Sequence, residues 1–384
     1  MTPDARFRHV IAGIRDLFPA GEQVHLHVPW FDRADEEAVA ACVRSSFVSS
    51  VGAEIAGFEQ ELAAFVGAPH AVAVVNGTAA LHIALLLAGT APGDLVITQA
   101  FTFIATANAI VHAGARPVFV DIDPGTLGMS PEALRTFLDG ACTMRAGVCM
   151  HRATGARVRA CVPMHTFGMC ARVEEIAAIC ADHGLVLVED AAEALGSRVG
   201  QRHAGTFGAM GTFSFNGNKI ITCGGGGAVV CHDAELARHA KHITTQAKRP
   251  HPWEFAHDAV GFNHRMPALN AALARSQMAK LPHNLARKRD LHHRYRELFQ
   301  GSPWQLVAEP PGTTANHWLN TLLLRDRAER DAFLAATHAA GVLTRPAWEP
   351  LHTQPMYAGD IRGGLAVTMD MHQRAVSLPS SATP

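Results

Sequence analysis

The hydrophobic pattern between residues 71 and 188 alternates short apolar runs with longer amphipathic segments. Buried strands are expected at 71–75, 95–98, 117–120, 159–162 and 185–188. Helices are expected between them at 79–87, 101–112, 130–138 and 173–183. Strands that are apolar throughout and alternate with helices are typical of a mostly parallel sheet covered by helices on both faces. The pattern therefore predicts an α/β fold for this part of the chain.

The pattern changes toward both ends of the chain. Residues 1–18 interleave acidic and basic side chains, which predicts a short amphipathic helix and not a signal peptide. After about residue 245 the sequence becomes irregular, and then a long helix is expected at 268–299, broken near Pro282. Further helices are expected at 34–44, 58–65 and 328–340, and a strand at 318–324. We expect an N-terminal segment (1–30), a large α/β domain (31–255) and a smaller α+β C-terminal domain (256–384).

Polar side chains follow three of the predicted strands. They are Asn76, His165 and Asp190. Because ligands of parallel sheets bind beyond the carboxyl ends of the strands, we expect these residues to converge in one crevice. The position of Asp190 indicates a functional role for this residue, since burying an isolated carboxylate at the end of a strand costs free energy unless it has a partner. The turn at 76–78 could hold phosphate on the N-terminus of the following helix, or could be an ordinary turn.

One lysine stands beside a run of glycines in residues 211–227. Lys219 is the only cation between His203 and His232, and four glycines end the segment. Glycines let a backbone approach a bound group closely, and a lysine amine can form Schiff bases with carbonyl compounds and with pyridoxal phosphate (PLP). The alternative is a surface lysine before a flexible loop. A PLP site needs an imine-forming lysine and an acidic partner for the pyridine nitrogen, and Asp190 supplies such an acid.

Composition narrows the function classes. The formal net charge of −1 gives no electrostatic footprint for nucleic acid or an anionic membrane. No apolar run approaches the ~20 residues that span a bilayer. The eight cysteines form no C-x-x-C pair, which is typical of a reduced, cytoplasmic chain. The 23 histidines show no metal-ligand spacing, so no metal site is expected.

Five segments in order resemble the DegT/DnrJ/EryC1/StrS family of PLP-dependent sugar aminotransferases. They lie at 76–85, 189–197, 214–227, 261–274 and 345–348. The resemblance implies fold-type I, a homodimer with shared active sites, and amino transfer from a donor, by default L-glutamate, to a nucleotide-linked keto sugar. The chain is most similar to the branch that makes 4-amino-4,6-dideoxy sugars, which includes the transaminases of the legionaminic acid and bacillosamine pathways. The implied substrate is a UDP- or GDP-linked 4-keto-6-deoxy-N-acetylglucosamine.

The resemblance also implies roles for single residues. Lys219 matches the Schiff-base lysine and Asp190 the carboxylate that pairs with the pyridinium nitrogen. Glu193 matches the position beside the phenolic oxygen of the cofactor, where many relatives carry Gln, and a carboxylate there would need a shared proton. The remaining cofactor positions are Gly77, Thr78 and Ser214 at the phosphate, Phe103 stacked on the ring, and Asn263 at the phosphate of the partner subunit. Candidate substrate residues are His165, Trp318, Arg345 and Trp348.

Each of these assignments has a structural alternative. Phe103 could be part of the core, Thr78 and Ser214 could only cap and turn, and the substrate candidates could be structural. Cys223, His264 and the pair Gln99-Ala100 depart from the usual family residues without touching the imine, ring-nitrogen or phosphate positions. Two other functions remain open: a PLP enzyme of another reaction, such as a perosamine-type aminotransferase or a sugar dehydratase, and a non-catalytic nucleotide-binding module. Lys219 argues against the related 3-dehydratases, in which histidine replaces this lysine.

Overall fold

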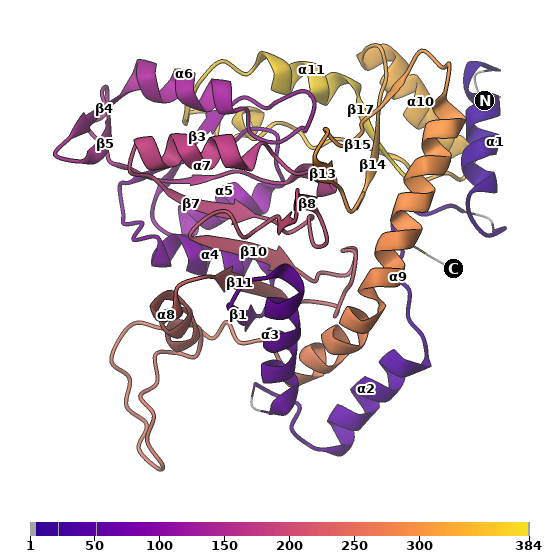
Figure 1. Cartoon of the computed structure of the whole chain (residues 1–384). Coiled ribbons are helices and arrows are strands. Elements are labelled where there is room, and N and C mark those ends of the chain that lie inside the picture. The colour runs from indigo at the N-terminus through magenta and orange to yellow at the C-terminus, as the bar shows by residue number, and fades with distance from the viewer. Residues whose placement is uncertain (1–4, 22, 51, 383–384) are drawn as a thin grey trace.

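A large mixed sheet forms the centre of the computed structural model, which describes residues 5–21, 23–50 and 52–382 (Figure 1). Within these residues its eight strands run in the order β1 (His70–Val74), β11 (Gly227–Cys231), β10 (Met210–Ser214), β7 (Val186–Asp190), β6 (Val158–Val162), β2 (Leu95–Gln99), β3 (Arg116–Val120) and β16 (Ile361–Arg362). Neighbouring strands are parallel except at β11, which is antiparallel to both β1 and β10. The predicted α/β fold with a mostly parallel sheet is confirmed.

Helices cover both faces of this sheet because its strands are apolar on both sides. One face packs against α4 (Gly77–Leu87), α5 (Ile104–His112) and α8 (Ala234–Thr244). The other face packs against α6 (Pro131–Ala141) and α7 (Val173–Asp182). Figure 1 shows α6 and α7 above the sheet and α4 and α8 below it. The side chains of Val96 and Val188 point to the first layer, and those of Ile97 and Leu187 to the second, as expected for central strands buried on both faces.

The predicted start of α6 is confirmed, and α4 begins two residues before its predicted start. Asn76 caps α4 by accepting the N–H of Ala79 at 2.8 Å. Ser130 caps α6 by accepting the N–H of Ala133 at 3.1 Å, and Pro131 occupies the first helical position. The Asn76 cap fixes where the first, unpaired N–H groups of α4 point, which matters for the site described below.

The predicted break in the long helix is wrong. Helix α9 (Ala268–Phe299) continues through Pro282 as one element. Its first half packs in the core that contains Phe215, and its second half, through Tyr295 and Phe299, packs in a different core. Because both halves are anchored, the hydrogen bond that Pro282 cannot donate does not end the helix. Figure 1 shows α9 running from α2 (Arg33–Arg44) and α3 (Ala53–Val66) up to α10 (Arg327–Ala339).

A second, smaller sheet lies beside the upper half of α9. Its described strands are β12 (Gln305–Leu306), β14 (Asn320–Leu323), β17 (Ala375–Leu378) and β15 (Arg345–Pro346), in this order and antiparallel. The N-terminal helix α1 (Arg8–Asp16) buries Val10 and Ile14 in the same core as Phe333 of α10, so the two ends of the chain pack together. The predicted amphipathic helix is confirmed over these residues, and residues 1–4 lie outside the described part.

The C-terminal residues belong to both sheets, since β16 pairs with β3 of the large sheet while β17 lies in the small one. The proposed domain boundaries stay a prediction.

The remaining elements are η1 (Ala5–Phe7), η2 (Thr166–Gly168), η3 (Leu351–Thr353), the hairpin of β4 (Cys142–Arg145) and β5 (Val148–His151), the sheet of β13 (Thr313–Thr314), β8 (Arg198–Val199) and β9 (Arg202–His203), and α11 (Ala366–Arg374). Of the helices in the described ranges, none has both the length and the apolar character that crossing a membrane requires.

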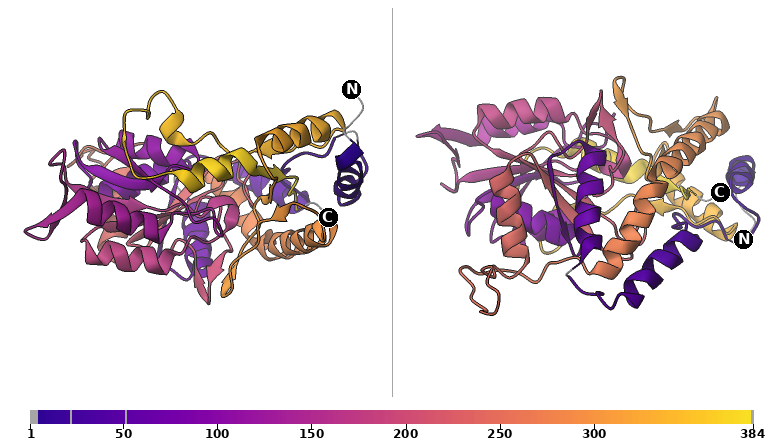
Figure 2. Two further views of the ribbon diagram at one scale, coloured as in Figure 1. Left: turned by 90° about the horizontal axis from the view of Figure 1, so that it is seen from above. Right: turned by 60° about the horizontal axis from the view of Figure 1, so that its bottom comes forward.

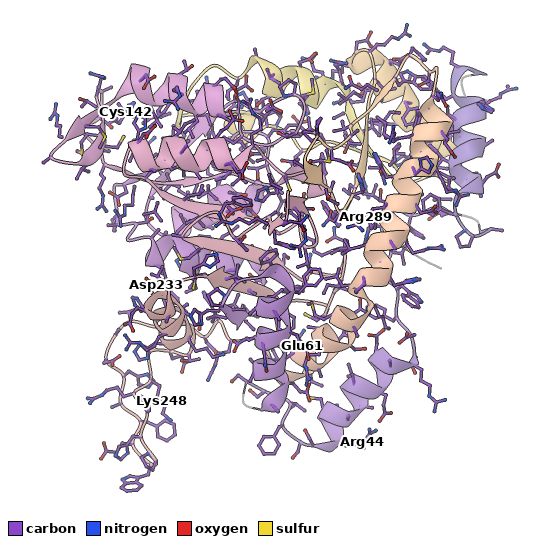
Figure 3. The ribbon with its side chains drawn as sticks, in the orientation of Figure 1. Arg44, Glu61, Cys142, Asp233, Lys248 and Arg289 are labelled. Carbon is purple, nitrogen blue, oxygen red and sulfur yellow. The ribbon has the colours of Figure 1, made fainter. Side chains whose placement is uncertain are left out.

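One loop stands away from the rest of the chain. It follows α8 and is visible below the sheet in Figure 1 and in the right view of Figure 2, and Figure 3 labels Lys248 within it. The loop carries large apolar side chains in solvent: Trp253 is 76% exposed, Phe255 79% and Val260 87%. Three such residues on one loop form an exposed apolar surface of a kind that often marks an interaction site.

Candidate active site

A cavity of about 350 Å³ opens at the carboxyl ends of β7 and β10, next to the N-terminus of α4. It brings together nine of the predicted site residues, namely Gly77, Thr78, Phe103, Asp190, Glu193, Ser214, Lys219, Trp318 and Trp348. Its wall also contains Asn76, Leu81, Ala105, Met164, Ala192, Asn216 and Asn218. Of the three residues expected to converge beyond the strand ends, Asn76 and Asp190 line the cavity and His165 does not. Ser214, the last residue of β10, also lines it.

The amine of Lys219 is held between a carboxylate and an aromatic ring. Its Nζ atom lies 3.2 Å from Oε1 of Glu193 and 4.1 Å from the centroid of the Trp318 indole. The indole is itself fixed, because its Nε1–H donates to the carbonyl of Asn218 at 2.7 Å. Only 12% of the Lys219 side chain is exposed, so this is not the surface lysine of the alternative interpretation.

Asp190 faces the same cavity from the end of β7. The carboxylate is buried, and it accepts the hydroxyl of Thr106 at 2.8 Å and the N–H of Ala192 at 3.2 Å. Burial raises the pKa of Asp190, whereas these two hydrogen bonds and the charge of Lys219 act in the opposite direction. An ionised carboxylate has more acceptor sites than these two donors use, so Asp190 can accept a further donor from the cavity.

Glu193 is a buried carboxyl that titrates near neutrality. Its Oε2 atom accepts the N–H of Phe167 at 2.9 Å, and Oε1 faces Lys219. Burial raises the pKa of Glu193 from its ordinary 4.5 to about 7. The positive charge of Lys219 and the hydrogen bond from the Phe167 N–H oppose this rise, whereas the negative charge of Asp190 adds to it. A carboxyl with this pKa can hold or release a proton at physiological pH, which fits the shared proton expected at this position.

Sequence reasoning missed Phe167. Its backbone is left-handed, with φ of +55°, which is uncommon for a residue with a side chain. This conformation points the backbone N–H of Phe167 at Glu193. The centroid of the Phe167 ring lies 4.7 Å from the ring centroid of Trp348 and 6.5 Å from that of Trp318. The sequence pattern singles out the nearby His165, and no local signal in the sequence reveals the unusual backbone of Phe167.

The structure places His165 outside the cavity. Its ring is fully buried, Nδ1 accepts the N–H of Ala171 at 3.1 Å, and Nε2 lies 3.0 Å from Oε2 of Glu189. Because Nδ1 is an acceptor, Nε2 carries the proton and donates to Glu189. Glu189 also accepts the backbone N–H groups of Gly205, Phe207 and Gly208, at 2.5 to 2.7 Å. His165 therefore supports the loop behind Asp190.

The N-terminus of α4 forms the far end of the cavity. The N–H groups of Gly77 and Thr78 lie in its first turn, where they have no helical acceptor. A Cβ atom on Gly77 would come 2.8 Å from Cβ of Ser214, so only glycine fits this close approach. Together with the helix dipole, these N–H groups and the Ser214 hydroxyl make an anion site.

Gly226 and Gly227 of the glycine run pack against the protein, and none of the four glycines lines the cavity. A Cβ atom on Gly227 would lie 2.4 Å from the backbone carbon of Asn76, so Gly227 lets β11 press against the turn that begins α4. The expectation that these glycines approach a bound group stays a prediction. Gly227 positions the anion site. The run leads into strand β11 and not into a phosphate-binding turn, which removes the basis for a nucleotide-binding module built on it.

Phe103 lies at the cavity and not in the core. It is the N-cap residue of α5, it is 48% exposed, and its ring centroid lies 6.2 Å from that of Trp348. Trp348 follows β15, and Arg345 on that strand is exposed and away from the cavity. Asn263 is also exposed and outside the cavity of its own chain, where it accepts the guanidinium of Arg265 at 2.8 Å.

Comparison with known proteins identifies the chain at this point. Residues 30–383 match the DegT/DnrJ/EryC1/StrS aminotransferase family. The chain belongs to this family. It is therefore a PLP-dependent aminotransferase with fold-type I architecture.

Relatives cover almost the whole chain. The GDP-perosamine synthase of Vibrio cholerae is 33% identical over 364 residues, which are 93% of this chain and 94% of the relative. The UDP-N-acetyl-3-dehydro-α-D-glucosamine 3-aminotransferase of Acidithiobacillus ferrooxidans is 33% identical over 342 residues, which are 87% of this chain and 85% of the relative. The solved structure of Helicobacter pylori PseC, an aminotransferase involved in the biosynthesis of pseudoaminic acid, superposes with a TM-score of 0.85 at 25% identity and covers 94% of both chains.

The residues of this chain fit PLP. The cofactor carries an aldehyde, a pyridine nitrogen and a phosphate, and the cavity offers a matching group for each. Lys219 offers an amine, Asp190 a buried carboxylate with acceptor sites to spare, and the start of α4 an anion site narrowed by Gly77.

Proposed function

We propose that this aminotransferase moves an amino group, with L-glutamate as the donor, to C4 of a nucleotide-linked 4-keto-6-deoxy sugar. The sugar is UDP- or GDP-4-keto-6-deoxy-N-acetylglucosamine, and the product is a 4-amino-4,6-dideoxy sugar for a surface glycan of the legionaminic acid or bacillosamine type. The relatives support a nucleotide-sugar substrate, because two of them are named for GDP- and UDP-linked sugars. The reaction takes place in the cytoplasm, which the eight unpaired cysteines, all in the described part of the chain, support.

The arrangement around Lys219 carries the proposal. When bound, PLP supplies an aldehyde that takes up the amino group and a ring that accepts the electrons released with the proton. Lys219 Nζ provides the amine that anchors the cofactor and then takes and returns the proton at the reacting carbon atoms. Asp190 keeps a proton on the ring nitrogen, and Glu193, with its pKa of about 7, shares a proton beside Lys219. Trp318 and Trp348 narrow the cavity on the substrate side and exclude water.

We further propose a homodimer with shared active sites. Asn263 lies outside the cavity of its own chain, on the segment that follows the exposed loop. The side chains of Trp253, Phe255 and Val260 expose apolar surface on that loop, which a second copy of the chain would bury. Closed two-fold dimers are also the commonest assembly. In this dimer Asn263 contributes to the phosphate site of the partner.

The substrate is tested with the isolated enzyme. Glutamate converts the PLP form to the pyridoxamine form, which is then mixed with UDP- and GDP-linked 4-keto-6-deoxy sugars, with and without the N-acetyl group. We expect a single turnover with an N-acetylated sugar and a new amine at C4 by NMR. Turnover only with the sugar that lacks the N-acetyl group would favour the perosamine-type reaction. Loss of a hydroxyl without amine transfer would favour a dehydratase.

A further inference from the structure

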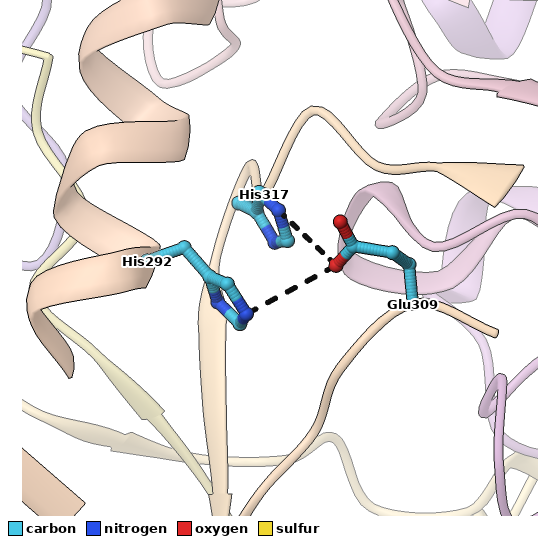
Figure 4. Close-up of side chains that lie close together, drawn as sticks. All are labelled: His292, Glu309 and His317. Carbon is cyan, nitrogen blue, oxygen red and sulfur yellow. Dashed lines mark ion pairs between the residues drawn. The ribbon is translucent and has the colours of Figure 1, made fainter. Parts of the chain in front are cut away.

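Two histidines and a glutamate converge outside the active site, beside the upper half of α9 (Figure 4). His292 comes from α9, Glu309 from the segment between β12 and β13, and His317 from the residue before Trp318. Their ligand atoms all lie within 4.8 Å of one another. Oε2 of Glu309 is 3.4 Å from Nε2 of His317 and 4.0 Å from Nε2 of His292. Nothing in the aminotransferase chemistry described above uses this cluster.

A chain of hydrogen bonds fixes the tautomer of His292. The Ser380 hydroxyl donates to the Leu378 carbonyl at 2.8 Å, so its oxygen accepts from the Asn320 side-chain amide at 3.2 Å. The amide oxygen of Asn320 therefore faces Nδ1 of His292, at 2.8 Å, and Nδ1 carries the proton. The lone pair of His292 is then on Nε2, the atom that points to Glu309.

This lone pair has no partner. Nε2 of His292 is buried without a hydrogen bond, and the whole residue is only 5% exposed. A neutral nitrogen lone pair that faces a carboxylate oxygen is repulsive, and an unsatisfied buried acceptor is costly. A cation between the two atoms would satisfy both.

The geometry of the cluster limits what this cation can be. Imidazole nitrogens suit zinc and other transition ions, whereas magnesium and calcium prefer oxygen ligands throughout. In a tetrahedral zinc site with bonds of about 2.0–2.1 Å, two ligand atoms lie roughly 3.4 Å apart. Oε2 of Glu309 and Nε2 of His317 have this separation. The His292 and His317 rings are stacked, with centroids 3.8 Å apart and an angle of 9° between their planes, so their lone pairs lie in nearly parallel planes. Binding one ion through both nitrogens therefore requires the two rings to tilt out of this stacked arrangement.

The surroundings resemble those of established metal ligands. A ligating histidine usually donates its second N–H to a fixed acceptor, as His292 does to Asn320. Glu309 is one-third exposed and gives the ion access from solvent, whereas both histidines are buried. His317 has a left-handed backbone with φ of +47°, which turns its ring to His292 while the next residue, Trp318, packs over Lys219.

We propose that His292, Glu309 and His317 bind a divalent transition-metal ion, with zinc as the preferred occupant and an open fourth position for water. The ion joins α9 to the two chain segments that carry Glu309 and His317. Because His317 precedes Trp318, the ion also steadies the backbone that presents the indole to Lys219. The prediction from the sequence that no metal site exists is replaced by this proposal, since spacing along the chain could not show a cluster built from three separate segments.

The experiment uses the PLP-loaded, full-length enzyme after treatment with a chelator. Zn²⁺ is added and the metal retained after dialysis is counted by mass spectrometry, and Co²⁺ is added in parallel to record the visible absorption of the ion. The variants are Glu309→Gln, which keeps the size of a partly exposed side chain, and His317→Asn, which tolerates a left-handed backbone. His293→Ala is the matched control, because this neighbour of His292 is exposed on α9.

We expect the wild type and the His293→Ala variant to retain one more zinc ion per chain than Glu309→Gln or His317→Asn. We expect Co²⁺ to give the strong visible bands of a four-coordinate site in the first two proteins only, and Glu309→Gln to weaken zinc binding by at least about 10-fold. Equal zinc content in all four proteins, or a wild type without these Co²⁺ bands, would overturn the proposal. Either result would identify the cluster as a metal-free pair of stacked imidazoles beside a carboxylate.

Discussion

The amine of Lys219 lies 3.2 Å from a carboxyl oxygen of Glu193, in a cavity that almost excludes water from both side chains. Burial raises the pKa of Glu193 to about 7, so its carboxyl group binds and releases a proton near neutral pH. This relationship connects the stability of the empty enzyme with its chemistry, and it can be measured through pH.

Glu193→Gln should change how the stability of the apoenzyme depends on pH. The pKa of Glu193 is about 7 in the folded chain and near 4.5 when unfolded, so between these values the folded state holds one more proton. Stability contributed by this group is therefore present below pH 4.5 and is lost as the pH rises to 7, by about 3 kcal/mol in total. Glutamine has no such loss. Relative to the wild type, the variant should gain stability from pH 5 to 8 in urea unfolding, and parallel profiles would contradict this assignment.

Asp190→Asn should leave the cofactor bound but slow both half-reactions. An amide cannot keep a proton on the ring nitrogen, so the ring becomes a poorer electron acceptor. We expect single-turnover rates with glutamate to fall roughly 10²–10³-fold, as for other lost electrostatic contacts in active sites. Asp139→Asn, on the exposed face of α6, is the control and should keep the wild-type rate. An unchanged rate in Asp190→Asn would show that Asp190 is not the partner of the ring.

Gly227→Ala should weaken cofactor binding from outside the cavity. The added methyl would lie 2.4 Å from the Asn76 backbone, and moving that turn displaces the N–H groups of Gly77 and Thr78. We expect a loss of stability of about 1–3 kcal/mol, as for other overpacked positions, and weaker retention of PLP on dialysis. Gly225→Ala is a matched control in the same run, because its nearest neighbour atom is 3.8 Å away. Equal PLP affinity in the two variants would contradict the role given to Gly227.

Mixing two inactive variants tests the shared site. In a hybrid of Lys219→Ala and Asn263→Asp, one site carries both lesions and the other carries neither, if Asn263 serves the partner. Asn263→Asp is expected to be inactive alone, because its carboxylate repels the phosphate. Random exchange between two-fold dimers should then restore about one quarter of wild-type activity.

A second mixture controls this experiment. A hybrid of Lys219→Ala and Asp190→Asn should stay inactive, since both residues serve the site of their own chain and each site carries one lesion. If subunit exchange is demonstrated and the first mixture also stays inactive, Asn263 acts within its own chain or through folding, and the shared-site proposal fails.

The parts of the site that were predicted are those that local sequence determines. Asp190 ends an apolar strand, Asn76 has the chemistry of a helix cap, and Lys219 stands alone among uncharged residues, so each is visible within a short window. Phe167 was missed because a left-handed backbone at a bulky residue is imposed by its surroundings. His165 also follows a strand, as Asp190 does, but its side chain turns to Glu189 and away from the cavity. The hydrophobic pattern of the sequence does not distinguish a strand end that faces a cavity from one that is buried.

Long-range packing explains the other differences. Pro282 predicts a break in a helix on local grounds, but α9 is held in two cores at once, and the sequence near the proline contains neither partner. His292 and His317 are separated along the chain and meet only because β14 lies beside α9. Such contacts depend on the whole fold, so the cluster of His292, Glu309 and His317 could not be found by its spacing along the chain.

Reduction with borohydride followed by peptide mapping tests the central claim most directly. Borohydride fixes PLP to the amine that holds it, so the label reports which lysine forms the bond. The account predicts loss of the yellow colour and a single modified peptide with the label on Lys219, and no label in the Lys219→Ala variant. A label on another lysine in the wild type, such as the buried Lys288, or retention of the label in Lys219→Ala, would contradict it.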